Sequence, residues 1–579
     1  MCVRCPTESL WHKFVMHKAD RAKEYNITSG KLFNFRPILF VALFLCAGIV
    51  FTYATLLKGF SNAWFWALLP VVVFPFFFCK NKADCYTRAV AVAGLLLAFF
   101  VGVGVSRLQF AAYTYNEAFD YGESTVVGRV VEKAEYDTSV RVLLDDVYID
   151  GKRVQGKLNA YLPRTFDIKI QLSDNLLLVA AVEKNTAPFG EYGFRASEIS
   201  NDVRYFARGV KACEVTGHDF QLFHELRNRI EKVVYAGMDD DTAAVTMAVL
   251  TGDTSGMEEG LLENTRRGGI AHIFAVSGLH VGALYAFCLL LFQKTFLRKL
   301  PKGARFGLLA TLFFIYGGIC GFSPSIVRAS VICSVAYAFS LLGIKADFLT
   351  SLGGAAIVIL LFSPVALFEV GFQLSFAACF GIALFAKPLR DFMEAKLHAI
   401  VLRCSESARR ERAAEENVAP HKRDTCPLSV VGELKNNAIT FLSASIAAQV
   451  TTAPLLLYYF GYISGWSLFL NCLFVPLIGG LFSVLLSFVL IASVLPIAVS
   501  GVILYLPNVV WAAVLLLFYA FDFSSFCLTG IKLSVIPIFL FYLWLTFFSD
   551  KWNLSPRWKS VAKWTVVLGF AVTVYALNV

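Results

Sequence analysis

Apolar residues along this chain are grouped mainly in runs of about 20, the length at which a helix crosses the hydrocarbon core of a bilayer. Three runs lie before residue 110, at about 37–57, 62–79 and 89–107. Ten more follow at about 269–293, 306–321, 324–343, 348–365, 368–386, 437–460, 466–495, 499–521, 530–548 and 561–577. The pattern predicts a polytopic α-helical membrane protein with about thirteen spans.

Residues 110–218 show a different pattern, in which short β-type segments replace the long apolar runs. Asp150-Gly151 marks a hairpin turn within this region. The predicted strands are Ser124–Val131, Ser139–Tyr148, Lys157–Leu162 and Asn175–Val182. Several short strands in about 100 residues predict a small β-barrel of the OB type, a fold that often binds single-stranded nucleic acid.

The charge of this β-region does not strengthen the nucleic-acid interpretation. Between Ala111 and Tyr235, 16 Lys and Arg residues are balanced by 19 Asp and Glu residues, so no basic footprint is evident. A β-domain that serves only packing or partner contact fits the sequence equally well.

The remaining segments complete the domain plan. Residues 1–36 are expected to form a basic tail, and residues 37–109 hold the first three predicted spans. The pattern of residues 219–265 predicts amphipathic helices on the outer membrane surface, and helices that only pack against the bundle are the alternative. Residues 266–579 form the large membrane domain, in which the polar segment 388–435 is expected to be a mobile cytoplasmic loop. Asn471 and Pro476 predict a broken or kinked helix in the run 466–495.

Composition and charge agree with a membrane protein. Hydrophobic residues make up 57% of the chain and charged residues 16%, whereas soluble proteins carry about 25% charge. The net charge of +10 fits Lys- and Arg-rich cytoplasmic loops, which place the N-terminus inside and both the β-domain and the C-terminus outside. The fourteen cysteines are mostly scattered singly in apolar runs, so they indicate small hydrophobic side chains rather than a disulfide framework.

Two apparent ligand motifs are weak. Cys2 and Cys5, with His12 beyond, have spacing unlike ordinary zinc sites, so a solvated tail is the better interpretation and no metal is expected. The run from Gly151 to Lys157 has P-loop spacing, but Leu158 stands where Ser or Thr should hold magnesium. We therefore expect no cofactor and no nucleotide site in this chain.

The stretch from Arg266 to Val281 carries the most distinctive polar residues of the membrane domain. If it were helical, His272, Ser277 and His280 would form a polar strip on one face, and Gly269 and Gly278 would allow another helix to approach closely. A strip of this kind either lines a channel or contacts a substrate, or it holds neighbouring helices together by hydrogen bonds. Position alone does not decide between these roles.

Four further polar residues interrupt the apolar runs. Arg328 lies near the start of a span, where a fixed positive charge suits an entering polyanion, although arginines near helix ends also snorkel to the interface. Gln373, Gln449 and Asn471 are uncharged polar groups that either line a pore or connect helices.

Together these motifs resemble those of ComEC-type competence proteins, the inner-membrane DNA channels of natural transformation. The resemblance rests on Gly268-Gly-Ile-Ala-His272-Ile-Phe-Ala-Val-Ser277-Gly-Leu-His280-Val281. The other matching segments are Thr251-Gly-Asp253, Val327-Arg-Ala-Ser330, Gly371-Phe-Gln-Leu-Ser375, Gln449–Pro454 and Asn471–Pro476, in the family's order across about 220–550.

The resemblance implies passage of single-stranded DNA across the bacterial cytoplasmic membrane. It also implies an extracytoplasmic DNA-delivery protein and a cytoplasmic helicase-like motor as partners, and it makes His272, Ser277, His280 and Arg328 candidate pore or gate residues. Whether the chain forms a homo-oligomer within the lipid bilayer is left open by the sequence.

The chain departs from the family in one respect. Many members continue into a metallo-β-lactamase-like domain, whereas this sequence ends at Val579 without that domain's His-x-His-x-Asp-His cluster. We therefore expect no enzyme activity here, and strand degradation would need a separate nuclease. Two alternatives remain: a transporter of another anionic polymer or lipid-linked substrate, and an intramembrane hydrolase that uses Ser277 with a histidine.

Overall fold

The computed structural model describes the chain in segments, and the statements below concern those residues. They are 37–57, 83–114, 122–135, 139–163, 170–185, 196–218, 221–274, 276–343, 347–415, 428–519, 527–529 and a few positions between 537 and 545. The predicted tail 1–36 and the predicted spans at 62–79, 561–577 and most of 530–548 lie outside the described residues. All elements named below belong to one compact unit, Pro37–Ser534.

Seven described helices are long and apolar enough to cross a membrane. They are α2 (Pro37–Leu57), α4 (Ala83–Thr114), α11 (Pro324–Leu341), α13 (Val370–Glu415), α14 (Leu428–Phe460), α15 (Ser467–Val494) and α16 (Ser500–Tyr519). The shorter apolar helices α9 (Gly278–Lys294) and α12 (Phe348–Phe362) accompany them. A membrane protein is thus confirmed, whereas the count of thirteen spans stays a prediction.

The first two described helices cross closely through glycine. The helices α2 and α4 pack against each other, and Gly48 and Gly102 leave no room for a side chain between the two backbones. Small residues at such a crossing allow membrane helices to approach within van der Waals distance.

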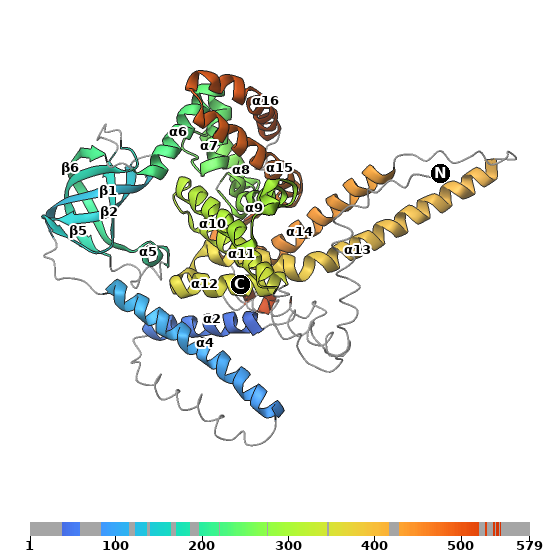
Figure 1. Ribbon diagram of the computed structural model, residues 1–579, viewed down its shortest axis with the longest axis horizontal. Coiled ribbons are helices and arrows are strands. Elements are labelled where there is room, and N and C mark those ends of the chain that lie inside the picture. The colour runs from blue at the N-terminus through green and yellow to red at the C-terminus, as the bar shows by residue number, and fades with distance from the viewer. Residues whose placement is uncertain are drawn as a thin grey trace. The chain divides into compact units, whose positions relative to one another are not determined.

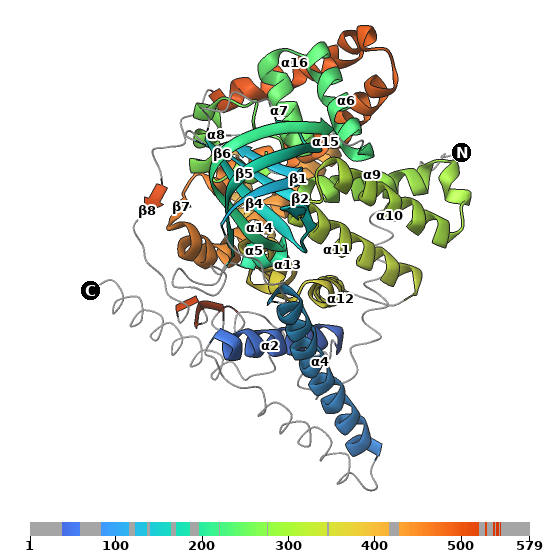
Figure 2. The same cartoon turned by 90° about the vertical axis from the view of Figure 1, so that its left-hand side faces the viewer.

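Six strands form the β-domain: β1 (Glu123–Glu135), β2 (Ser139–Ile149), β3 (Lys152–Arg153), β4 (Lys157–Pro163), β5 (Asp174–Lys184) and β6 (Val203–His218). They pair in the order β1-β5-β6-β4-β2-β3, and β1 also pairs with β2, so the five longer strands close a barrel (Figure 2). The interior is filled by alternate side chains such as Val126, Leu144 and Leu158, which are fully buried. The predicted OB-like barrel is confirmed, including the hairpin at Asp150-Gly151.

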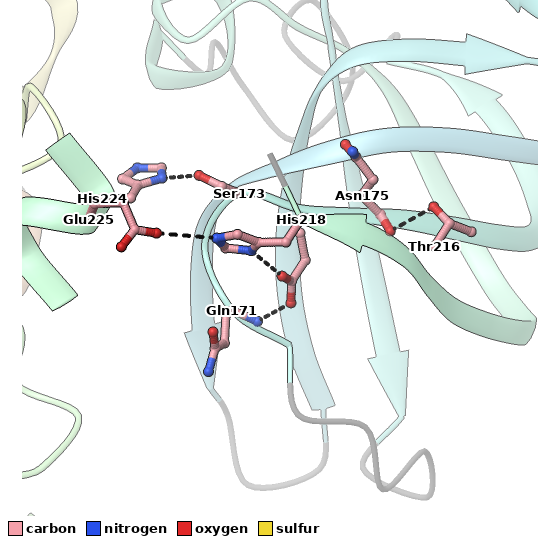
Figure 3. Close-up of polar contacts among 8 residues, drawn as sticks. Gln171, Ser173, Asn175, Thr216, His218, His224 and Glu225 are labelled. Carbon is pink, nitrogen blue, oxygen red and sulfur yellow. Dashed lines mark hydrogen bonds and ion pairs between the residues drawn. The ribbon is translucent and has the colours of Figure 1, made fainter. Parts of the chain in front are cut away.

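Polar contacts connect the barrel to the following helix, α6 (Leu222–Gly237). Figure 3 shows His218, at the end of β6, between the barrel and Glu225 of α6. His218 Nδ1 lies 2.7 Å from Asp174 Oδ1, and its Nε2 lies 3.7 Å from Glu225 Oε1. Ser173 of the barrel contacts His224 of α6 beside them. In the described part of the chain, no cluster of three or more His, Cys, Asp or Glu side chains is arranged to hold a metal ion.

The segment predicted as surface helices, 219–265, forms α6, α7 (Asp240–Thr251) and α8 (Glu259–Arg267). The interfacial prediction is wrong for α7, because every side chain from Thr242 to Thr251 is buried. The helix α6 packs against α10 (Lys302–Ile319), α15 and α16. The ring of Phe223, in α6, packs directly against Gly318 of α10. The helix α7 therefore follows the packing alternative, whereas the interfacial placement of α6 and α8 stays a prediction.

The predicted mobile loop 388–435 is also wrong for most of its length. Figure 1 shows α13 and α14 as two long neighbouring helices, and the described helices extend to Glu415 and resume at Leu428. Ala, Glu, Leu and Arg are abundant in this segment and are strong helix formers. Arg390 and Glu394 add an ion pair one turn apart, with 2.7 Å between Nε and Oε1.

The helix α15 runs without interruption from Ser467 to Val494 through Asn471 and Pro476. The helix in the run 466–495 is therefore not broken, whereas a kink at Pro476 stays a prediction. Membrane helices tolerate an internal proline where protein or water groups satisfy the backbone group that it frees.

Candidate functional site

Several sequence motifs of the membrane domain lie at one end of the helix bundle. The helices α9, α10, α11, α12 and α13 follow one another through short connections, and successive helices joined in this way alternate in direction (Figure 1). The beginnings of α9, α11 and α13 therefore share one end with the last residues of α10 and α12. The arginine motif begins α11, and the glycine–glutamine motif begins α13.

A cavity of about 720 Å³ opens at this end. Its lining brings together residues from α5 (Ala196–Ser200) of the β-domain, from α6, from the end of α7 and from the starts of α11 and α13. The polar members of the lining are Ser197, Asn201, Arg227, Thr251, Ser323, Ser325, Arg328, Glu369 and Tyr459. The Thr251-Gly-Asp253, Val327–Ser330 and Gly371–Ser375 motifs thus contribute to one site.

Arg328 is held inside the cavity wall by a loose ion pair. Its Nη1 lies 3.7 Å from Glu369 Oε2, and the two side chains are only 8% and 12% exposed. Arg328 Nε is buried without a hydrogen-bond partner among the described residues. A Cβ added at Gly371 would lie 2.9 Å from Arg328 Nη2, so glycine at this position leaves the space that the guanidinium occupies.

A second arginine in the wall is paired more tightly. Arg227 Nη2 donates to Asp253 Oδ2 at 2.8 Å, and Asp253 Oδ1 accepts from the Ser255 backbone N–H and hydroxyl at 3.1 and 2.6 Å. Burial acts to raise the pKa of the Asp253 carboxyl, but the hydrogen bonds from Ser255 and the charge of Arg227 outweigh it and lower the pKa. Asp253 therefore stays ionised and fixes Arg227.

The signature stretch is not one helix, so the predicted polar strip of His272, Ser277 and His280 is wrong. The helix α8 ends before Gly269, whose φ of 73° lies in the left-handed region, and a short 3₁₀ turn, η2 (Ala271–Ile273), follows. Ser277 is the N-cap of α9, where its side chain accepts from the Leu279 N–H. Glycine pairs and serine caps terminate and begin helices, which the helical wheel ignored.

Within this stretch the two histidines have different surroundings. His280 is fully buried, and its Nδ1 accepts from the Ser277 backbone N–H at 3.0 Å. The His280 ring packs on Phe482 at 4.8 Å between centroids, and its Nε2 has no partner in the described chain. His272 is exposed. The Ser277 hydroxyl lies 3.3 Å from the same His280 Nδ1, and these contacts together form the capping box that begins α9.

The signature reaches the cavity through other atoms. Val276 lines the cavity and contacts the position where Gly252 would carry a Cβ, at 3.0 Å. A Cβ added at Gly278 would lie 3.6 Å from Ala329 Cβ, next to Arg328, which is an ordinary van der Waals contact. The predicted packing role of Gly278 therefore stays a prediction.

The remaining predicted residues form a second polar group between α8, α14 and α15. Ser467 Oγ donates to Gln449 Oε1 at 3.1 Å, and a Cβ at Gly269 would lie 2.8 Å from Ser467 Cβ. Gln449 Nε2 and Asn471 Oδ1 are buried without partners among the described residues.

Gln373 is connected to the cavity through an aromatic side chain. Its Oε1 accepts from the Tyr459 hydroxyl at 2.8 Å, and Tyr459 lines the cavity. Its Nε2 donates to the Leu367 carbonyl at 3.2 Å.

Sequence reasoning missed Arg227 and Glu369. Glu369 is a single carboxylate at the start of the apolar run 368–386, two residues before Gly371, which was the available signal. Arg227 lies in the segment 219–265, which was predicted to form surface helices, although its side chain lines the cavity.

Comparison with known proteins gives two matches. A family model described as "Competence protein" matches residues 249–555, which include most of the cavity wall but neither Arg227 nor α5. The "ComE operon protein 3" of Bacillus subtilis (strain 168) is 27% identical over 289 residues. That match covers 50% of this chain but only 31% of the relative, so the chain spans less than a third of that protein. No solved structure matches the chain.

Proposed function

Since the chain belongs to the competence protein family, we propose that it forms a transmembrane channel for the uptake of single-stranded DNA across the cytoplasmic membrane. The observation that carries this proposal is the cavity at one end of the bundle, where Arg328 presents a buried guanidinium with unused N–H donors. The planar guanidinium group can donate two parallel N–H···O hydrogen bonds to one phosphate, so this wall suits a phosphodiester backbone.

The ends of the helices support the same proposal. The helices α9, α11 and α13 begin at the end of the bundle that carries the cavity, and helix N-termini carry partial positive charge. Several such ends together attract anions without adding net charge to the membrane. In the orientation expected from the Lys and Arg distribution, this end faces the outside, where DNA arrives.

The β-domain extends the path. Ala196, Ser197 and Asn201, which precede β6, line the cavity, so a strand bound to the barrel would lie beside Arg328. Farther along the bundle, Gln449 Nε2 and Asn471 Oδ1, which have no partner among the described residues, would offer polar contacts to the strand. DNA would then pass from the barrel to the arginine-lined cavity and on to these uncharged groups.

The partners are also part of the proposal. A DNA-delivery protein would supply the strand outside, a helicase-like motor inside would pull it, and a separate nuclease would degrade the other strand if degradation occurs. The channel residues would guide DNA without catalysing a reaction.

The decisive experiment measures entry of labelled DNA into the cytoplasm of a transformable host. Cells carry the wild-type protein, a deletion, Arg328→Ala or the charge-preserving Arg328→Lys, each at equal abundance by immunoblot. We expect the deletion and Arg328→Ala to leave DNA bound outside, and Arg328→Lys to retain partial entry because lysine binds phosphate only as a point charge. Unchanged DNA entry in the deletion would overturn the proposal and favour a transporter of another anionic polymer or lipid-linked substrate.

A further inference from the structure

The two arginine pairs of the cavity wall differ in construction. In the pair of Arg227 and Asp253, the donor–acceptor distance of 2.8 Å is that of a hydrogen bond, and Ser255 occupies the other carboxylate oxygen. Breaking this pair would leave both a cation and an anion without their partners. Arg227 and Asp253 therefore form a fixed part of the wall.

The pair of Arg328 and Glu369 lacks these features. Its separation of 3.7 Å exceeds the range of an N–H···O hydrogen bond, and Arg328 Nε is buried without a partner in the part of the chain that the structure describes. A buried guanidinium nitrogen without an acceptor is costly, because its hydrogen bond to water is lost and not replaced. An acceptor that enters the cavity beside Arg328 would offer the hydrogen bonds that Glu369 does not supply.

We propose that Glu369 is a displaceable counter-ion, which neutralises Arg328 while the cavity is empty and gives up this place to a phosphodiester of the entering strand. This inference rests on the proposed function and assigns a regulatory role to Glu369 within the same site. Phosphate oxygens accept from guanidinium in pairs, so they make the hydrogen bonds that Glu369 does not make.

Two consequences follow from the charge balance. An empty cavity with an unpaired Arg328 would concentrate small anions such as chloride at the entrance of the channel, so Glu369 keeps the resting channel closed to them. When DNA is bound, the displaced carboxylate stays in the cavity and repels the phosphate. Conduction requires binding weak enough to release the ligand, and Glu369 supplies that weakening.

The test uses the full chain, purified for binding and reconstituted in lipid vesicles for flux. Glu369→Gln removes the charge at constant size, and Glu259→Gln, an exposed position on α8, is the matched control. Chloride influx is followed with a chloride-quenched dye, and oligothymidylate binding is followed by fluorescence anisotropy. Melting temperatures verify that each variant is folded.

We expect Glu369→Gln to raise chloride influx several-fold and to tighten oligothymidylate binding by about fivefold to tenfold, since a competing charge is lost. DNA entry in cells should nevertheless become slower, because the strand is released less readily. Glu259→Gln should match the wild type, and Asp253→Asn should not raise chloride influx. The double variant Arg328→Gln/Glu369→Gln should return chloride influx to the wild-type value and lose the tightened binding.

The outcomes separate this inference from the proposed function. Wild-type chloride influx and wild-type binding in Glu369→Gln would overturn the counter-ion role while leaving the DNA channel intact. If neither wild type nor variant binds oligothymidylate, the DNA channel fails, and the chloride measurement still decides the counter-ion role. If Glu369→Gln does not fold, Glu369→Asp keeps the charge farther from Arg328, and unaltered chloride influx in that variant would overturn the inference.

Discussion

Replacing Gly371 by alanine changes the space around Arg328 without changing any charge. The new Cβ would lie 2.9 Å from Arg328 Nη2 and 3.6 Å from both Cζ and Nη1. Non-bonded heavy atoms of this kind settle at about 3.5 Å or more, so the guanidinium must move by roughly 0.5 Å or more. The moving group is the far end of a flexible side chain, whereas the α13 backbone can stay in place.

The expected effects on stability and on binding differ in size. An off-rotamer arginine costs about 0.5–1.5 kcal/mol, and alanine in place of glycine in a helix gains up to about 1 kcal/mol. The free energy of unfolding should therefore change by less than about 1 kcal/mol. A misaligned charge-assisted hydrogen bond to phosphate loses about 1.5–3 kcal/mol, which is about tenfold to a hundredfold in DNA binding.

The assay compares Gly371→Ala with Gly282→Ala on α9, where a Cβ would meet nothing within 4 Å. DNA entry and oligothymidylate affinity should fall at least about tenfold in Gly371→Ala and stay near the wild type in Gly282→Ala. Both proteins should melt within about 3 °C of the wild type. Wild-type DNA entry in Gly371→Ala would refute the role assigned to the position of Arg328, and a large drop in its melting temperature would show that Gly371 serves packing instead.

Three further substitutions test other contacts. Asp253→Asn should lower the free energy of unfolding by about 1.5–3 kcal/mol, because Arg227 loses its anion. The pKa of Asp253 is lowered in the folded protein, so the difference in melting temperature between variant and wild type should shrink as the pH falls. Equal melting temperatures near neutral pH would refute the idea that this pair is fixed. The hydrogen bond to Asp174 raises the pKa of His218 in the folded protein. The contribution of His218 to stability is therefore complete below its pKa of about 6.5 in the unfolded chain, and it is lost as the pH rises through its pKa in the folded protein. His218→Asn should lower the melting temperature at about pH 6 and not at about pH 8.5, and an equal effect at both would refute the charge argument. Gly102→Ala should lower the free energy of unfolding by about 1–3 kcal/mol, because the new methyl group meets the α2 backbone across the helix crossing. Gly104→Ala is the control, since a Cβ at Gly104 meets nothing within 4 Å. Equal melting temperatures for the two variants would refute the close crossing.

The barrel could be predicted from the sequence because its signals are local. Apolar and polar residues alternate around Val126 and around Leu144, and this alternation specifies a strand at each place. The turn at Asp150-Gly151 specifies a hairpin in the same local way. The cavity could not be predicted, because it depends on which helix ends meet. Nothing near Glu369 in the sequence indicates Arg328 as its partner, since the pair joins different helices.

The signature stretch illustrates a different limit. Its apolar residues continue without interruption across Gly269 and Ser277, so hydropathy reads one span from 269 to 293. The structure begins α9 only at Gly278, because Gly269 adopts a left-handed conformation and Ser277 caps the helix. A cap signal inside an apolar run carries more information about such a boundary than hydropathy does.

The positions of the polar residues explain how a bundle this apolar can handle a polyanion. Arg328 and Gln373 lie in the first turns of α11 and α13, as His280 and Asn471 do in α9 and α15. A charge at the centre of a membrane helix costs about 2.5–3.5 kcal/mol. Near a helix end water reduces that cost, and at Arg328 the carboxylate of Glu369 offsets a further part of it. In the proposed channel, recognition of phosphate would therefore be concentrated at the cavity, where a charge is tolerated, and the deeper contact would be left to an uncharged amide, Gln449. The proposed channel would recognise the charge of its substrate at the entrance, and the deeper contact that we assign among the described residues, Gln449, carries no charge that would retain the substrate.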